Sequence, residues 1–183
     1  MNCRKRAKSM IEQLVKEINI CLENECFLSA LGMALTLPDI CGKAEYPTEK
    51  YVSKRYINWF NTYVSNYEKP PSPYGDDMPY LSGEVLFSLR NSVLHQGTPN
   101  VYTTKVSDER FKIDEFILTI DDYTQSGLSH VVYDSGTNVS FKQLQVNLCN
   151  LCVRLTHVAD EYYKNNKSKF TFFNYTLKDR RYK

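Results

Sequence analysis

Long apolar runs, glycine-rich segments and strong charge of one sign are all scarce in this sequence of 183 residues. No uninterrupted apolar stretch reaches the roughly 20 residues of a membrane-spanning helix. The basic start of the chain (Arg4, Lys5, Arg6 and Lys8) is not followed by the apolar core of a signal peptide. The net charge of +2 excludes a strongly basic nucleic-acid clamp, and no glycine-rich phosphate loop occurs. We therefore expect no membrane segment and a cytoplasmic location.

The cysteines lie mostly inside hydrophobic stretches, whereas a disulfide-held secreted domain would place them in loops. We expect free thiols at Cys3, Cys21, Cys26, Cys41, Cys149 and Cys152. Cys149 and Cys152 have the two-residue gap of a metal or redox pair. A closed zinc site needs about four ligands, however, and no second Cys or His pair stands at a useful spacing. We therefore expect two buried thiols, no metal and no cofactor.

Hydrophobic residues make up 42% of the chain, which suffices for one packed domain over residues 1–183. Apolar residues recur three and four positions apart in several segments, as one face of a helix requires. Pro38 is expected to end the second helix, and Ser82 to cap the fourth. The predicted helices cover 6–22, 26–37, 48–67 and 82–94, and a final long helix covers 140–165, capped by Ser140.

Between the fourth and the last helix the periodicity changes to an alternation of apolar and polar residues. Residues 111–120 and 130–133 are predicted strands, joined by a turn over 121–127. We expect a mainly α protein, an up-and-down helical bundle with a small β-hairpin inserted at about 111–134 before the long last helix.

The tail over residues 167–183 interleaves Lys and Arg with aromatic residues. Such a composition can stack nucleobases and hold phosphates. We favour the simpler interpretation, in which its aromatic side chains pack on the core or on a partner subunit.

One short run carries side chains suited to chemistry on a phosphodiester. Arg90 and His95 are five positions apart on one predicted helix, with Asn91 between them. A neutral imidazole can take a proton from an RNA 2′-hydroxyl, and an imidazolium can give one to the leaving 5′-oxygen. A guanidinium can bind phosphate and stabilise the charge of the transition state. An α-helix, however, separates residues five apart by about 140° beyond a full turn, so a neighbouring helix or a symmetric dimer would be needed to unite the two side chains.

The run from Leu89 to Gly97 resembles the signature of the HEPN superfamily: an Arg, a polar neighbour, and a His four to six positions after the Arg. The match falls on Arg90, Asn91 and His95. The resemblance implies a helical bundle that forms a homodimer, an RNA substrate, and metal-independent endoribonuclease activity. It also implies a toxin or antiviral setting, with an antitoxin or another protein as a candidate partner. The strands before the last helix depart from the minimal bundle and leave the subfamily open.

A non-catalytic alternative also fits the sequence. Inactive members of this superfamily serve as dimeric binding or interaction modules, and Arg90 could pair with Glu84 while His95 caps its own helix. An ordered salt bridge of Arg90 together with a buried His95 would favour that alternative. A surface-exposed pair that faces its symmetry mate across a groove would favour the nuclease.

Overall fold

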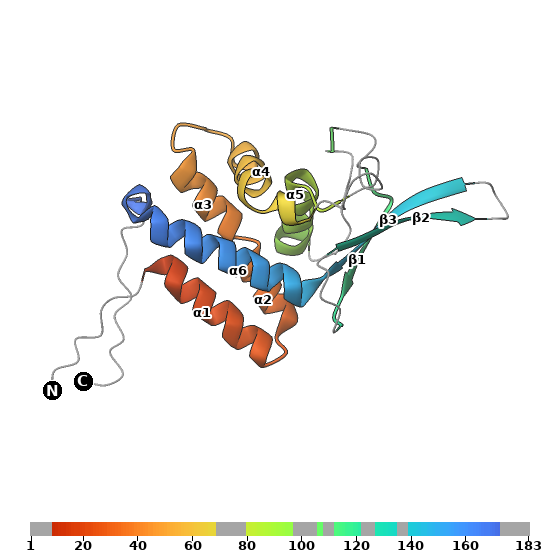
Figure 1. The fold of residues 1–183 in the computed structure, drawn as a ribbon, viewed down its shortest axis with the longest axis horizontal. Coiled ribbons are helices and arrows are strands. Elements are labelled where there is room, and N and C mark those ends of the chain that lie inside the picture. Colours follow the sequence, from red (N-terminus) through yellow and green to blue (C-terminus); the bar gives the residue numbers. More distant parts are fainter. Residues whose placement is uncertain are drawn as a thin grey trace.

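The computed structural model describes residues 9–68, 80–96, 106–107, 112–121, 127–134 and 139–172. The basic cluster at the chain start, the segment 69–79, Gly97 and Pro99, and the tail beyond residue 172 lie outside these residues. The described part is mainly helical, with a small sheet before the last helix, which confirms the predicted fold class (Figure 1). None of the described helices is both long enough and apolar enough to cross a membrane.

Each predicted helical segment contains a helix of the structure, although most helix ends differ from the predicted ones. The helical elements are α1 (Met10–Glu23), α2 (Phe27–Ala34), α3 (Leu37–Glu45), α4 (Val52–Tyr63), the 3₁₀ turn η1 (Ser65–Tyr67), α5 (Gly83–Asn91), the π-helical turn η2 (Ser92–Gln96), α6 (Leu148–Asn165) and the 3₁₀ turn η5 (Lys167–Phe170). Ser82 caps α5 as predicted, because its hydroxyl accepts a bond from the backbone N–H of Val85. The structure departs from the predicted helix over 26–37: α2 ends at Ala34, and a further helix that was not predicted, α3, begins at Leu37 with Pro38 in its first turn. Proline fits this position because a first-turn N–H has no partner within the helix.

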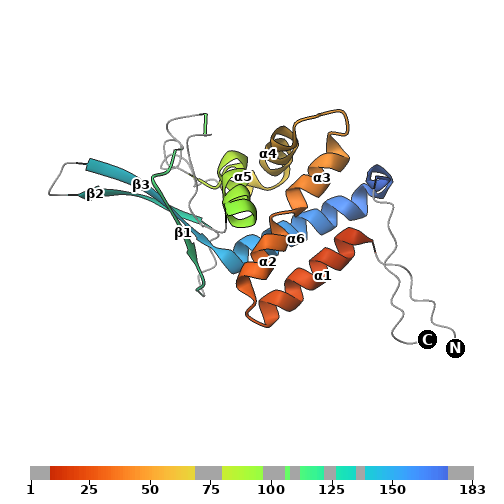
Figure 2. The ribbon, with the colours of Figure 1, turned by 180° about the vertical axis from the view of Figure 1, so that it is seen from behind.

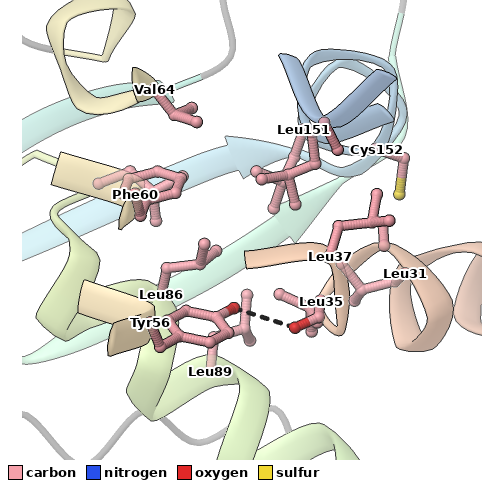
Figure 3. Packing of buried hydrophobic residues seen from close by; sticks show 14 of the residues in the cluster. Leu31, Leu35, Leu37, Tyr56, Phe60, Val64, Leu86, Leu89, Leu151 and Cys152 are labelled. Atoms are coloured by element: carbon pink, nitrogen blue, oxygen red, sulfur yellow. Dashed lines mark hydrogen bonds between the residues drawn. The ribbon is translucent and has the colours of Figure 1, made fainter. Parts of the chain in front are cut away.

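The last helix occupies the middle of the bundle. It contacts α1, α2 and α3, and α1 lies on one side of it with α4 and α5 on the other (Figures 1 and 2). Figure 3 shows the buried side chains between these helices, with the Tyr56 hydroxyl donating to the backbone carbonyl of Leu35. The core therefore fixes α5, the helix that carries the Arg-Asn pair, against both α4 and the start of α3.

Gly42 in α3 and Gly83 in α5 each allow a close approach to the backbone of α4. A Cβ atom on Gly83 would lie 2.7 Å from the backbone oxygen of Ile57, and one on Gly42 would lie 2.7 Å from the backbone oxygen of Arg55. The backbone N–H of Gly83 also donates to the side chain of Asn61. The start of α5 is thus held in direct backbone contact with α4.

The three strands form a sheet with the order β1–β3–β2 at one end of the bundle (Figure 1). They are β1 (Glu115–Thr119), β2 (Gly127–Asp134) and β3 (Val139–Asn147). The predicted pairing of the first two strands is wrong: β2 pairs antiparallel with β3, and β1 pairs parallel with β3 on the other side. A β-hairpin does precede the last helix, but it is made by β2 and β3 and extends beyond the predicted range of 111–134.

The predicted cap of the last helix is wrong as well. Ser140 lies in β3, and α6 begins at Leu148 with Asn147 as its cap, where the Asn147 side chain accepts from the N–H of Asn150. The same side chain donates to the backbone oxygen of Asp121. Asn147 therefore joins the end of the sheet to the start of the helix.

The described end of the chain packs on the bundle. Phe170 is buried against the rings of Tyr162 and Tyr163, which confirms the predicted packing for this one aromatic residue of the tail. The Glu45 carboxylate accepts bonds from the Lys169 ammonium and the Tyr162 hydroxyl. The Lys169 bond, followed by that of Tyr162, lowers the pKa of Glu45 from its usual value of 4.5.

This lowered pKa predicts a loss of stability in acid. A carboxyl whose pKa is depressed on folding stabilises the fold above its unfolded pKa and loses that contribution as the pH falls through the folded pKa. We expect the wild type to melt above Glu45→Gln near neutral pH, and the gap to close as the pH falls below the usual value of 4.5. Thermal melts of both proteins over a pH series measure this. A gap that stays constant in acid would contradict the role of the Glu45 charge.

Candidate functional site

The Arg90, Asn91 and His95 side chains lie at the end of α5, where the helix changes its winding. Arg90 and Asn91 belong to the last turn of α5, and His95 belongs to the π-helical turn η2. A π-helical turn closes from residue i to i+5, so residues five apart lie closer to one face than they do in an α-helix. The wider turn reduces the separation of about 140° expected for an α-helix, and the two side chains meet within one chain.

The three side chains form a connected hydrogen-bond cluster, which we call the Arg-Asn-His cluster. The Arg90 Nη1 group lies 2.9 Å from Asn91 Oδ1 and 2.8 Å from His95 Nε2. A guanidinium only donates hydrogen bonds, so His95 Nε2 must accept. The imidazole is thus neutral in this arrangement and carries its proton on Nδ1.

The cluster is open to solvent on the histidine side and closed on the arginine side. His95 is exposed, while Arg90 and Asn91 are half-buried. The Arg90 Nε group is buried and has no hydrogen-bond partner among the described residues, and the guanidinium carbon lies 6.0 Å from the Phe87 ring centroid. A buried donor without a partner costs about 1–3 kcal/mol. A functional side chain is one setting in which native structures carry such a cost.

The proposed structural partner of Arg90 is engaged elsewhere. Both carboxylate oxygens of Glu84 accept from Ser107, one from its backbone N–H and one from its hydroxyl. Within the described ranges, no Asp or Glu forms an ion pair with Arg90. The salt bridge that would favour a purely structural motif is thus not found in the described part of the chain.

The π-helical turn η2 packs on the helical bundle. Ser92 is buried, and Val93 packs against the hydrophobic core. Leu94 lies over α2 at Gly32, where a Cβ atom would be 3.7 Å from Leu94 Cδ2. Packing on both sides of the backbone therefore holds His95 in the position that faces Arg90.

A groove of roughly 610 Å³ adjoins the Arg-Asn-His cluster. Its walls come from the start of α4 and from one face of α5, and its lining residues are Tyr51, Val52, Ser53, Ile57, Glu84, Phe87 and Asn91. Asn91 belongs both to the groove and to the cluster. The sequence interpretation missed this groove, although Glu84, Phe87 and Asn91 recur at three and four positions and so share a helix face.

The Cys149–Cys152 pair lies at the first turns of α6 rather than in mid-helix. Cys152 is buried and Cys149 half-buried. Burial raises the pKa of the Cys152 thiol to about 12 and, with the Asp121 charge, raises that of Cys149. The thiolate that metal binding or disulfide exchange requires is thereby suppressed. Among the described residues, no group of three or more His, Cys, Asp or Glu side chains is arranged to hold a metal ion.

Comparison of the chain with protein-family models, with curated proteins and with solved structures finds no match in any of the three. The function is therefore argued from the site itself.

Proposed function

We propose that this protein is a metal-independent endoribonuclease of the HEPN type. One observation carries the proposal: Arg90 Nη1 and His95 Nε2 lie 2.8 Å apart at the solvent-exposed end of α5. An acid–base group and a phosphate-binding group within one contact distance are the two elements that cleavage by a neighbouring 2′-hydroxyl requires.

The His95 imidazole acts first as the base. Its Nε2 takes the proton of the 2′-hydroxyl, and the 2′-oxygen forms a bond to the adjacent phosphorus while the bond to the 5′-oxygen breaks. The imidazolium then gives its proton to the departing 5′-oxygen. The products are a 2′,3′-cyclic phosphate and a free 5′-hydroxyl, and no co-reactant is needed.

Arg90 binds the reacting phosphate. Both hydrogens of Nη1 are used within the cluster, and Nε is buried, so Nη2 is the group left to meet a phosphate oxygen. His95 Nε2 becomes available as the base when it no longer accepts the bond from Nη1. Asn91 accepts from the guanidinium and holds its plane in place.

The resemblance to the HEPN superfamily supports the wider setting of the proposal. It favours a homodimer in which two clusters face one groove, and a role as a toxin or antiviral effector, with an antitoxin as the candidate partner. The free thiols among the described cysteines agree with a reducing cytoplasm. Light scattering of the purified protein measures the dimer directly.

We expect the purified protein to cleave single-stranded RNA in the presence of EDTA and to leave 2′,3′-cyclic phosphate ends. Neither the base nor the phosphate-binding group is a metal in this mechanism. Mass spectrometry of the products measures the ends, and the same oligonucleotide with 2′-deoxyribose throughout is the matched control, which should stay intact. Products with 3′-hydroxyl ends, or cleavage that EDTA abolishes, would refute the mechanism.

A non-catalytic binding module remains the second candidate. The observation in its favour is that Asn91 and His95 together satisfy the Nη1 group without any ligand. In that case the protein would bind RNA or a protein partner and leave RNA uncut. The cleavage assay, run beside a binding measurement, separates the two candidates.

A further inference from the structure

The groove beside the Arg-Asn-His cluster has the dimensions and the lining of a ligand site. Its volume of roughly 610 Å³ lies within the range of about 300–1,000 Å³ that small-molecule sites occupy. Apolar side chains such as Ile57 and Phe87 line it together with a few polar groups, among them Glu84 and Asn91. This mixture of apolar walls and few polar groups is typical of small-molecule sites.

An exposed aromatic ring stands at the groove. Tyr51 exposes 65% of its surface, and the Lys54 ammonium lies 5.1 Å from the ring centroid. Aromatic faces stack nucleobases whatever the sequence, and neighbouring cations attract the phosphate backbone. The start of α4 thus presents both elements of a single-stranded nucleic-acid contact.

The groove is continuous with the site where the proposed cleavage takes place. Asn91 lines the groove and accepts a hydrogen bond of 2.9 Å from Arg90. Phe87, another lining residue, lies against the Arg90 guanidinium. A phosphate held by Arg90 would therefore have its neighbouring nucleotide at the mouth of the groove.

We propose that this groove binds the base of a nucleotide that flanks the scissile phosphate, with Tyr51 as the stacking surface. The inference rests on the proposed nuclease function and adds a substrate-selecting site to it. Single-stranded RNA is the substrate class, because a base in a duplex is stacked and paired and cannot enter the groove.

Glu84 gives the groove a preference among bases. Its carboxylate only accepts hydrogen bonds, and each oxygen retains acceptor capacity beyond its bond from Ser107. A base that turns an amino group toward Glu84, as adenine, cytosine and guanine can, is favoured. Uracil has no amino group and presents carbonyl oxygens on either side of its single ring N–H, so it is disfavoured.

The test uses oligonucleotides in which one ribose alone carries a 2′-hydroxyl, so that cleavage is confined to one linkage and the flanking bases can be varied. We expect Tyr51→Ala to lower kcat/KM roughly tenfold, mainly through KM, since stacking on one aromatic ring contributes about that much to affinity. Tyr51→Phe keeps the ring and should retain the wild-type value. Glu84→Gln should reduce the discrimination against uracil, because an amide both donates and accepts.

Tyr67→Ala is the matched control, since Tyr67 exposes 70% of its surface and does not line the groove. Binding of a fully 2′-deoxy oligonucleotide, followed by fluorescence anisotropy, is measured beside cleavage, and thermal melts verify that each variant is folded. Weaker binding by Tyr51→Ala but not by Tyr67→Ala supports the base site, even if the wild type cleaves nothing; in that case only the nuclease proposal fails. Cleavage by the wild type with unchanged kcat/KM, binding and base preference in Tyr51→Ala overturns the base site and leaves the nuclease standing. A wild type that neither cleaves nor binds overturns both.

Discussion

Replacement of His95 by alanine is expected to reduce RNA cleavage by on the order of 10³-fold, within the range known for the loss of a positioned acid–base group. The loss should fall on kcat, because His95 acts on the proton and Arg90 still binds the phosphate. His95 is exposed, so its removal leaves no cavity in the core and the variant should melt close to the wild type. Single-turnover cleavage of a labelled oligonucleotide measures the effect.

His157→Ala is the matched control for this experiment. His157 is also an exposed histidine on a helix, but it lies in α6 and has no part in the Arg-Asn-His cluster. Its replacement should leave cleavage unchanged, which guards against effects of histidine loss in general. If His95→Ala cleaves RNA as fast as the wild type, the acid–base mechanism is wrong.

Replacement of Arg154 by methionine is expected to give the largest loss of stability, about 3 kcal/mol, the lower end of what breaking a buried ion pair costs. Arg154 Nη1 donates to Glu68 Oε1 and to the backbone oxygen of Tyr67, at 2.8 Å each. The Glu68 side chain is fully buried, whereas that of Arg154 is 25% exposed. Methionine would leave the Glu68 charge buried without this counter-ion, and chemical denaturation measures the resulting change in the free energy of unfolding.

The matched control is Lys164→Met, a second cation-to-methionine change on α6. Lys164 pairs with Asp160 and Glu161 on the helix surface, where solvent screens the charges, so little measurable change is expected. The double variant Arg154→Met with Glu68→Gln should be more stable than Arg154→Met alone, because the buried Glu68 charge is then removed. A double variant that is less stable than the single one would show that the Glu68 charge is not the source of the cost.

All the helices except α3 could be predicted from the sequence, because each has its own apolar stripe and local signals. The Ser82 hydroxyl marks the start of α5 through a bond within one turn, and Glu84 adds an acidic residue to that turn. The break at Pro38 was misjudged because the same residue is compatible with the end of one helix and the first turn of the next.

The sequence could predict that strands precede the last helix, but it could not predict which strands pair. Leu144 and Leu148 stand four apart and fit a helical stripe, yet Leu144 and Val146 are buried on alternate positions of a strand. The backbone of β3 is paired on both sides, by β1 and by β2, and these contacts come from distant segments. Local periodicity does not contain that information, which is why the helix was expected to start at Ser140 rather than after Asn147.

The site residues could be named from the sequence, but their contact could not. The α-helix expected from the sequence would separate Arg90 from His95 by about 140°. The π-helical turn that brings them together is packed on the bundle through Ser92, Val93 and Leu94. The groove at Tyr51 was missed for a related reason: Tyr51 and Asn91 belong to different helices, and only the close approach of α4 and α5 at Gly83 brings them to one surface.

The wider turn of η2 affects how many residues can separate an arginine and a histidine that meet on one helix. In an α-helix the residue that lies over Arg90 would be the fourth along, whereas here it is the fifth. A chain one residue shorter between the two side chains could therefore reach the same contact with an uninterrupted α-helix. The number of residues between the arginine and the histidine therefore goes with the type of helical turn that joins them, and in this chain five positions go with a π-helical turn.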